Sequence, residues 1–241
     1  MLGVLRRWLG AEDRAVNEPA EVDPLFSGLA GAEALGELRL GGRVRIDLLA
    51  HRAYHDRLVF RWEATPSYHA IAAIGHIDLG GDAHLCRFYL DNDTFLQLSL
   101  EGGALAEIKL FDFFAVTHLA DREFDRLINA PAAGSQAHAL GAERHALRAD
   151  TGTTFEFTRV WGEPGQAWTP PVMLHETVVS RERPGRRPVT HYGMLYERSV
   201  TDAPLREYLF LSAEDDHDGG FMLVENLGID LSWVDIDAIR A

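Results

Sequence analysis

The sequence predicts an α+β fold dominated by β-structure, in which antiparallel sheets from two related β-units carry a few short helices. A repeated pattern supports this prediction. Residues 95–112 and 208–230 each hold an aromatic-Leu-x-Leu-Ser-x-Glu strand, a Gly-Gly pair, and an apolar run with an inner Glu and a closing Asp. From residue 36 onward, apolar residues recur with period two, which is the period of a strand. Such a repeat usually reports architecture, here a possible internal duplication.

Strand candidates fill both halves of the chain. In the first half, the turn residues 91–93 separate two apolar runs and predict a hairpin, and a third run continues it as a meander. In the second half, Pro184-Gly185 predicts a reversal between two strands. The candidate strands are 38–48, 58–62, 84–90, 94–100, 104–111, 153–161, 172–181, 189–200, 205–213 and 221–226.

Helix signals are fewer. The best lies at 120–129, where Asp121 is a candidate N-cap and Phe124, Leu127 and Ile128 form an apolar stripe. Weaker candidates are 24–35, 67–74 and 231–239.

These elements divide the chain into four parts. Residues 1–22 form an N-terminal amphipathic or flexible segment, 23–130 a first β-rich unit, 131–150 a connection rich in Ala, Gly and His, and 151–241 a second β-rich unit. We expect the two units to pack as one globular body.

Composition narrows the class of protein. The formal net charge of -14 over 241 residues argues against binding to nucleic acid, which requires clustered positive charge. A single cysteine, Cys86, excludes an intrachain disulfide and a multi-cysteine metal site, and it fits a reducing cytoplasm. Its apolar strand pattern predicts a buried, inert thiol. No apolar run approaches the ~20 residues that span a bilayer. We predict no cofactor.

The N-terminus has an amphipathic pattern. Leu2, Leu5, Trp8 and Leu9 recur at helical spacing beside Arg6 and Arg7. One interpretation is a terminal helix that frays or docks locally. The other is a small foot for a membrane surface or a partner groove, in which Trp8 contacts the partner.

Three groups of residues are candidates for chemistry. His51 and His55 lie four residues apart, as metal ligands on a helix sometimes do, but no HExxH motif is present. The pair His175-Glu176 lies in a strand, where the two side chains point to opposite faces. The acidic run 214–218 offers Asp215, Asp216 and Asp218 as candidate cation ligands, and the alternative is a solvated turn.

An arginine-rich reversal forms the basic patch of the β-region. Arg183, Arg186 and Arg187, together with Arg181, can bind an acidic partner, a phosphate or a lipid head group. The alternative interpretation is a solubilising turn. We name residues 181–187 the arginine hairpin.

The motifs at 87–97, 110–112 and 194–198 resemble those of the YjfK-like family over about residues 35–235. The resemblance implies a bacterial protein with no assigned activity and no catalytic residues to carry over. It also implies an association with phage-shock-type membrane-stress proteins and small membrane proteins.

Two function classes follow. The first is a non-catalytic binding or adaptor protein with a protein partner, located in the cytoplasm or at the inner face of the membrane. The absence of nucleophile and phosphate-loop motifs favours it. The alternative is a metal-assisted hydrolase that uses some of the eleven histidines with acidic partners.

Overall fold

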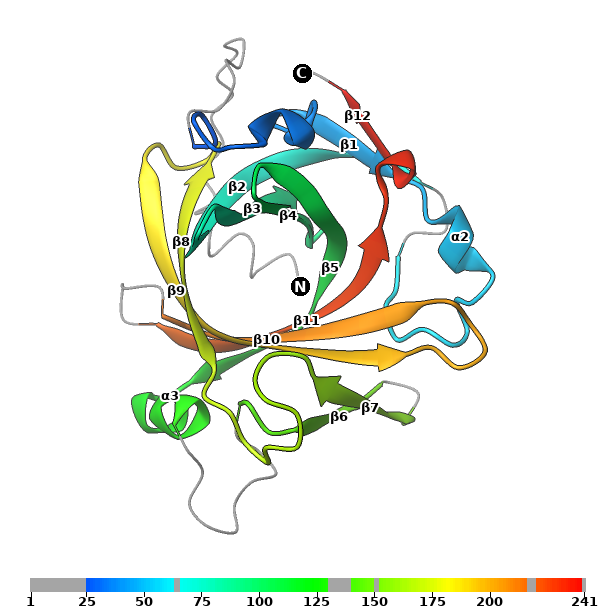
Figure 1. Ribbon diagram of the computed structural model, residues 1–241, viewed down its shortest axis with the longest axis vertical. Coiled ribbons are helices and arrows are strands. Elements are labelled where there is room, and N and C mark those ends of the chain that lie inside the picture. Colours follow the sequence, from blue (N-terminus) through cyan, green and yellow to red (C-terminus); the bar gives the residue numbers. More distant parts are fainter. Residues whose placement is uncertain (1–24, 63–65, 130–139, 150–151, 216–219, 240–241) are drawn as a thin grey trace.

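Eight antiparallel strands close into a barrel in the computed structural model, which describes residues 25–62, 66–129, 140–149, 152–215 and 220–239 (Figure 1). Around the ring the order is β2-β3-β4-β5-β11-β10-β9-β8, and β8 pairs again with β2. The bounds are β2 Tyr68–Gly80, β3 Ala83–Leu90, β4 Thr94–Glu101, β5 Ala104–Leu119, β8 Val172–Ser180, β9 Arg186–Ser199, β10 Arg206–Asp215 and β11 Phe221–Leu231.

Four shorter strands extend the sheet outside the ring. β1 (Arg43–Ile46) pairs with both β2 and β12 (Ile236–Ile239), while β6 (Arg144–Arg148) and β7 (Thr154–Arg159) continue from β9. Helices are few and short: η1 Ala32–Leu35, α2 Leu49–Arg52, α3 Asp121–Ile128 and η3 Trp233–Asp235. The predicted β-dominated class is therefore confirmed. Within the described residues, no helix combines the length and apolar character needed to cross a membrane.

The repeated pattern maps onto two hairpins, β4–β5 and β10–β11. They lie side by side because β5 pairs with β11, which sets Lys109 opposite Asp230 and Asp112 opposite Leu227. Since β5 and β11 are antiparallel, the two strands begin at opposite ends of the barrel. Neighbouring hairpins do not establish a common origin, and the internal duplication stays a prediction.

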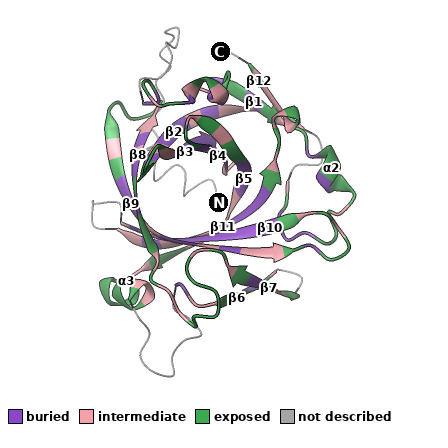
Figure 2. Cartoon of the chain, viewed as in Figure 1, coloured by how far each residue is buried: buried purple, intermediate pink, exposed green. Residues whose placement is uncertain are grey.

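Buried residues run along the strands of the ring (Figure 2), and they form one cluster on each face of the barrel wall. Inward-facing Phe95 and Phe111 belong to a cluster inside the ring. Outward-facing Leu96 and Leu98 belong to a larger cluster, which residues 25–38, Phe60 and parts of α3, β6 and β7 cover from outside. Burial of the outward face agrees with the near-continuous apolar runs in these strands.

Six of seven strand residues that the apolar runs predict to be buried are buried, and Leu195 is half-buried because it faces a cavity. The six are Phe88, Leu96, Leu98, Leu110, Leu209 and Leu211.

The helix predictions are partly wrong. Helix α3 is confirmed, but its N-cap is Ala120, whose N–H donates to Glu123 Oε2 at 3.0 Å, and not Asp121. Residues 67–74 instead begin β2, because pairing with β1 and β3 outweighs the local helix signal. The left-handed φ values of Gly28 and Gly31 restrict 24–35 to the short η1.

Two further elements differ from prediction near the chain's outer surface. Residues 231–239 end as strand β12 after the short η3, because β1 offers a free edge to pair with. Residues 58–62 form no strand, yet Phe60 is fully buried. Its N–H donates to the buried Glu207 Oε1 at 2.7 Å, and Arg198 binds the same carboxylate. The Glu207 carboxylate thus accepts the hydrogen bond that a neighbouring strand would otherwise accept from the Phe60 backbone.

Candidate functional site

Inward-facing glycines make room for large side chains inside the barrel. A Cβ on Gly75 of β2 would lie 1.7 Å from Glu176 Oε1, a distance that no structure tolerates. Likewise, a Cβ on Gly193 would lie 2.7 Å from the Phe210 ring, and a Cβ on Gly228 would lie 2.5 Å from the Phe111 ring. The glycines therefore allow one carboxylate and two aromatic rings to fill the interior.

Four charged residues form a buried group at the barrel centre, the inner ion cluster: Arg87, Glu176, His191 and Glu214. Arg87 Nη1 donates to Glu176 Oε2 at 2.9 Å, and His191 Nε2 lies 2.7 Å from the same oxygen. His191 Nδ1 lies 3.1 Å from Glu214 Oε1. Since both imidazole nitrogens face carboxylates, the protonated imidazolium satisfies both contacts. Two cations then balance two anions.

Neighbours complete the hydrogen bonding of the cluster. The Tyr89 hydroxyl donates to Glu176 Oε1 at 2.7 Å, and Arg87 Nε donates to Gln97 Oε1 at 2.9 Å. The Arg87 guanidinium carbon lies 5.4 Å from the ring centre of Phe95 and 5.3 Å from that of Phe210. Such a satisfied and desolvated network is typical of a structural element.

The ionisation of the cluster follows from these contacts. Burial opposes the charged form of His191, but Glu214 and Glu176 outweigh it and raise its pKa. Burial likewise opposes ionisation of Glu176, yet Arg87 and His191 lower its pKa to about 2. Burial, with Glu176 nearby, raises the pKa of Tyr89 well above its ordinary value. The pKa shifts therefore favour a doubly charged His191–Glu176 pair.

A second polar layer lies nearer one end of the barrel. Lys109 Nζ donates to Glu107 Oε2 at 2.8 Å and to Asp230 Oδ1 at 3.0 Å, and it lies 4.4 Å from the ring centre of Tyr208. The Lys109 side chain is only 4% exposed. Tyr208 donates its hydroxyl to Asp230 at 2.9 Å, and burial raises the pKa of that phenol.

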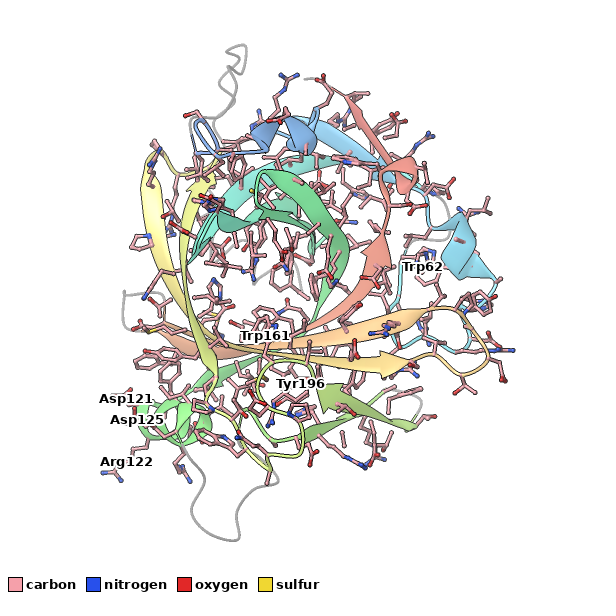
Figure 3. The ribbon with its side chains drawn as sticks, viewed as in Figure 1. Trp62, Asp121, Arg122, Asp125, Trp161 and Tyr196 are labelled. Atoms are coloured by element: carbon pink, nitrogen blue, oxygen red, sulfur yellow. The ribbon has the colours of Figure 1, made fainter. Side chains whose placement is uncertain are left out.

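Beyond this layer opens a cavity of about 320 Å³, the mouth cavity. Its polar side chains come chiefly from β4 and β5 and include Gln97, Ser99 and Glu107. Trp161 also lines it and meets the inward-facing Phe210 of β10 edge-on at 6.1 Å between ring centres. Figure 3 labels Trp161 beside β10. A barrel of eight strands has an interior wide enough to hold one small ligand.

The first two residues of the acidic run, Glu214 and Asp215, lie in strand β10. Glu214 is buried in the inner ion cluster, which corrects the solvated-turn interpretation for this residue, and Asp215 closes β10. Asp216 and Asp218 lie outside the described residues, as does Trp8. The expectation for His175 and Glu176 is confirmed: His175 is exposed and Glu176 is buried on the opposite face.

Metal ligation finds little support in the described parts of the chain. His51 lies on α2 and is buried, and burial lowers its pKa, whereas His55 is exposed beyond the helix. Among the described residues, no group of three or more His, Cys, Asp and Glu side chains is arranged to hold a metal ion. Cys86 is buried as predicted, and burial raises the pKa of its thiol to about 12.

The arginine hairpin lies at the other end of the barrel from the mouth cavity. Strand β8 begins at Val172, which lines the cavity, and runs nine residues to the hairpin. At about 3.3 Å per residue, its two ends lie roughly 25 Å apart. Arg183 and Arg186 are exposed, and Arg187 is half-buried.

The inner ion cluster was not predicted from the sequence. Its signal is a charged residue at an inward-facing position within an otherwise apolar strand, as at Arg87 and His191. The sequence pattern pairs Glu176 only with its chain neighbour His175, while its actual partners lie on β3 and β9.

Comparisons with known proteins identify a relative and a family for this chain. The chain is similar to "Uncharacterized protein YjfK" of Escherichia coli (strain K12), with 28% identity over 214 residues that cover 84% of this chain and 89% of the relative. No solved structure gives a significant match. A family model described as "Protein of unknown function (DUF2491)" matches residues 5–237. The predicted resemblance is therefore confirmed, and the chain belongs to the DUF2491 family.

Proposed function

We propose that the protein is a non-catalytic binding or adaptor protein whose principal binding surface is the mouth of the barrel. The observation that carries this proposal is the mouth cavity, an open space in the barrel lumen lined by both polar and apolar side chains. The charged groups deeper in the lumen bind one another, so they leave no group poised to attack a substrate.

Exposed apolar side chains at the mouth support the proposal. Leu79 and Val172 line the cavity and remain 48% and 40% exposed. Val160, next to Trp161 in the chain, is 41% exposed. Apolar side chains that stay in solvent around a cavity are typical of a surface that a partner covers.

The arginine hairpin supplies a second surface for an adaptor role. It is the basic patch of the β-region in a chain of net charge -14, so it favours an acidic partner or an anionic head group. An adaptor needs two surfaces that can be occupied together, and about 25 Å of barrel separates these two.

We further propose that the protein works in the cytoplasm beside the inner face of the membrane, with a protein partner from a membrane-stress assembly. The sequence pattern of residues 1–10 and the associations of the YjfK-like family support this location. The body's negative charge opposes direct binding to anionic lipid, which favours attachment through a protein.

Two double variants test the adaptor role. Leu79→Asp/Val172→Asp alters the mouth, and Arg186→Glu/Arg187→Glu alters the arginine hairpin. Each should remove a different set of proteins captured from the native host and quantified by mass spectrometry. The matched controls are Val234→Asp, at a 91% exposed position, and Arg144→Glu on β6, whose side chain is 72% exposed. An unchanged set of captured proteins for both double variants would contradict the proposal.

The alternative function, a metal-assisted hydrolase, is tested separately. It requires a stoichiometric transition metal in protein purified without chelator, which elemental analysis measures directly.

A further inference from the structure

We infer that the mouth cavity binds a small organic cation, specifically an ammonium group carried on an apolar body. This inference rests on the proposed binding role of the mouth and names the chemistry of its ligand.

The charges around the cavity favour a cation. Glu101 and Glu107 line it, and Asp230 contacts Lys109 from the adjacent strand β11. The cavity and its edge thus hold three carboxylates against the one ammonium group of Lys109, which also lines the cavity. Lys109 is already bound by two of them and lies over the Tyr208 ring, so its charge is not available to an anion. An incoming anion would meet excess negative charge, whereas an incoming cation would be attracted.

The aromatic and hydroxyl groups of the cavity also suit an ammonium ligand. Trp161 contributes its indole, the ring that binds cations best, to the same cavity as Glu107. Ser99 adds a hydroxyl oxygen that can accept a hydrogen bond from the ammonium group. An aromatic face combined with a carboxylate is a common arrangement for recognising organic cations.

The apolar side chains that line the rest of the cavity require that the cation carry an apolar body. Leu85, Leu174 and Leu195 face the cavity from β3, β8 and β9. A bare inorganic cation would leave these side chains against water. The volume of about 320 Å³ lies at the lower end of small-molecule sites, which span about 300–1,000 Å³.

Phenethylamine provides a direct probe, because its amine is protonated at neutral pH and its ring is apolar. Its neutral counterpart is 2-phenylethanol and its anionic counterpart is 3-phenylpropanoate. Isothermal titration calorimetry with the full chain should give the amine a dissociation constant of about 1 mM or below. We expect binding at least about fivefold tighter than that of either counterpart.

Variants test whether the measured binding occurs in the cavity. Glu101→Gln/Glu107→Gln should remove the preference for the amine over the alcohol, while Glu156→Gln on β7, whose side chain is 70% exposed, should not. Filling the cavity with Leu195→Phe or, independently, Ser99→Phe should weaken amine binding by about tenfold or more. Circular dichroism checks that each variant is folded.

Three results would overturn the inference: equal or tighter binding of the alcohol or acid, no detectable binding of the amine, or amine binding that survives both filling variants. None of them would refute the binding role itself, since the partner-capture experiment with the mouth and hairpin variants measures that role without a small-molecule probe.

Discussion

His191 is the residue whose proton most directly controls the inner ion cluster, because each of its nitrogens faces a carboxylate. Its folded-state pKa lies above the ordinary value of 6.5. The stabilisation that protonated His191 gives the folded state is therefore complete below pH 6.5 and is lost as pH rises through the folded-state pKa. Loss of the proton leaves Glu176 and Glu214 with one cation, Arg87.

The first prediction is that the free energy of unfolding falls as the pH rises above about 6.5. Urea denaturation across this range measures it. In His191→Gln the fall should be much smaller, although the variant is less stable throughout. If the free energy of unfolding falls equally with pH in the wild-type protein and the variant, another group causes the pH dependence.

Asp112 responds to pH in the same sense as His191 but in a lower pH range. Burial, with Asp93 nearby, raises its pKa from 3.8 to about 6. The folded protein therefore holds this proton more tightly than the unfolded chain, and stability falls as pH rises from about 4 to 6. The second prediction is that Asp112→Asn stabilises the protein by about 1–2 kcal/mol at neutral pH and by little near pH 4. Chemical denaturation at the two pH values measures this, and a destabilised variant at neutral pH would contradict it.

At the scale of elements, strand β2 depends on Gly75 for its approach to β8. Gly75→Ala would drive a methyl group into Glu176 Oε1, so Glu176 must leave Arg87 and His191. The third prediction is a loss of about 3–5 kcal/mol, the cost of breaking a buried ion pair. In a Glu176→Ala background the same substitution should cost much less. Additive losses in this double-mutant cycle would show that the collision does not involve Glu176.

The paired hairpins β4–β5 and β10–β11 place equivalent leucines on the outward face of the barrel. Leu98 and Leu211 are buried there in one apolar cluster. The fourth prediction is that Leu98→Ala and Leu211→Ala each cost about 2–5 kcal/mol in thermal or chemical unfolding. Val234→Ala, at a 91% exposed position, should be nearly neutral. An unchanged free energy of unfolding in either leucine variant would mean that this leucine is not packed against the outward face of the barrel.

At the scale of the whole molecule, the period of two and the turn residues determined which segments are strands and where most hairpins turn. The Asp91-Asn92-Asp93 turn, helix α3 and the burial of six strand residues all follow from local pattern. Such patterns are readable because turn chemistry and side-chain alternation act between residues that are near in sequence.

Tertiary structure alone decided which face of each strand points into the barrel and which side chains meet there. Both faces carry apolar residues, so alternation could not identify the inside. Arg87 and Glu176 are 89 positions apart, and only closure of the ring through β2 and β8 brings them within 2.9 Å. The mouth cavity likewise combines residues from strands in both halves of the chain. Contacts of this kind depend on the order of strands around the barrel, which is set by the packing of the complete chain and not by any local segment.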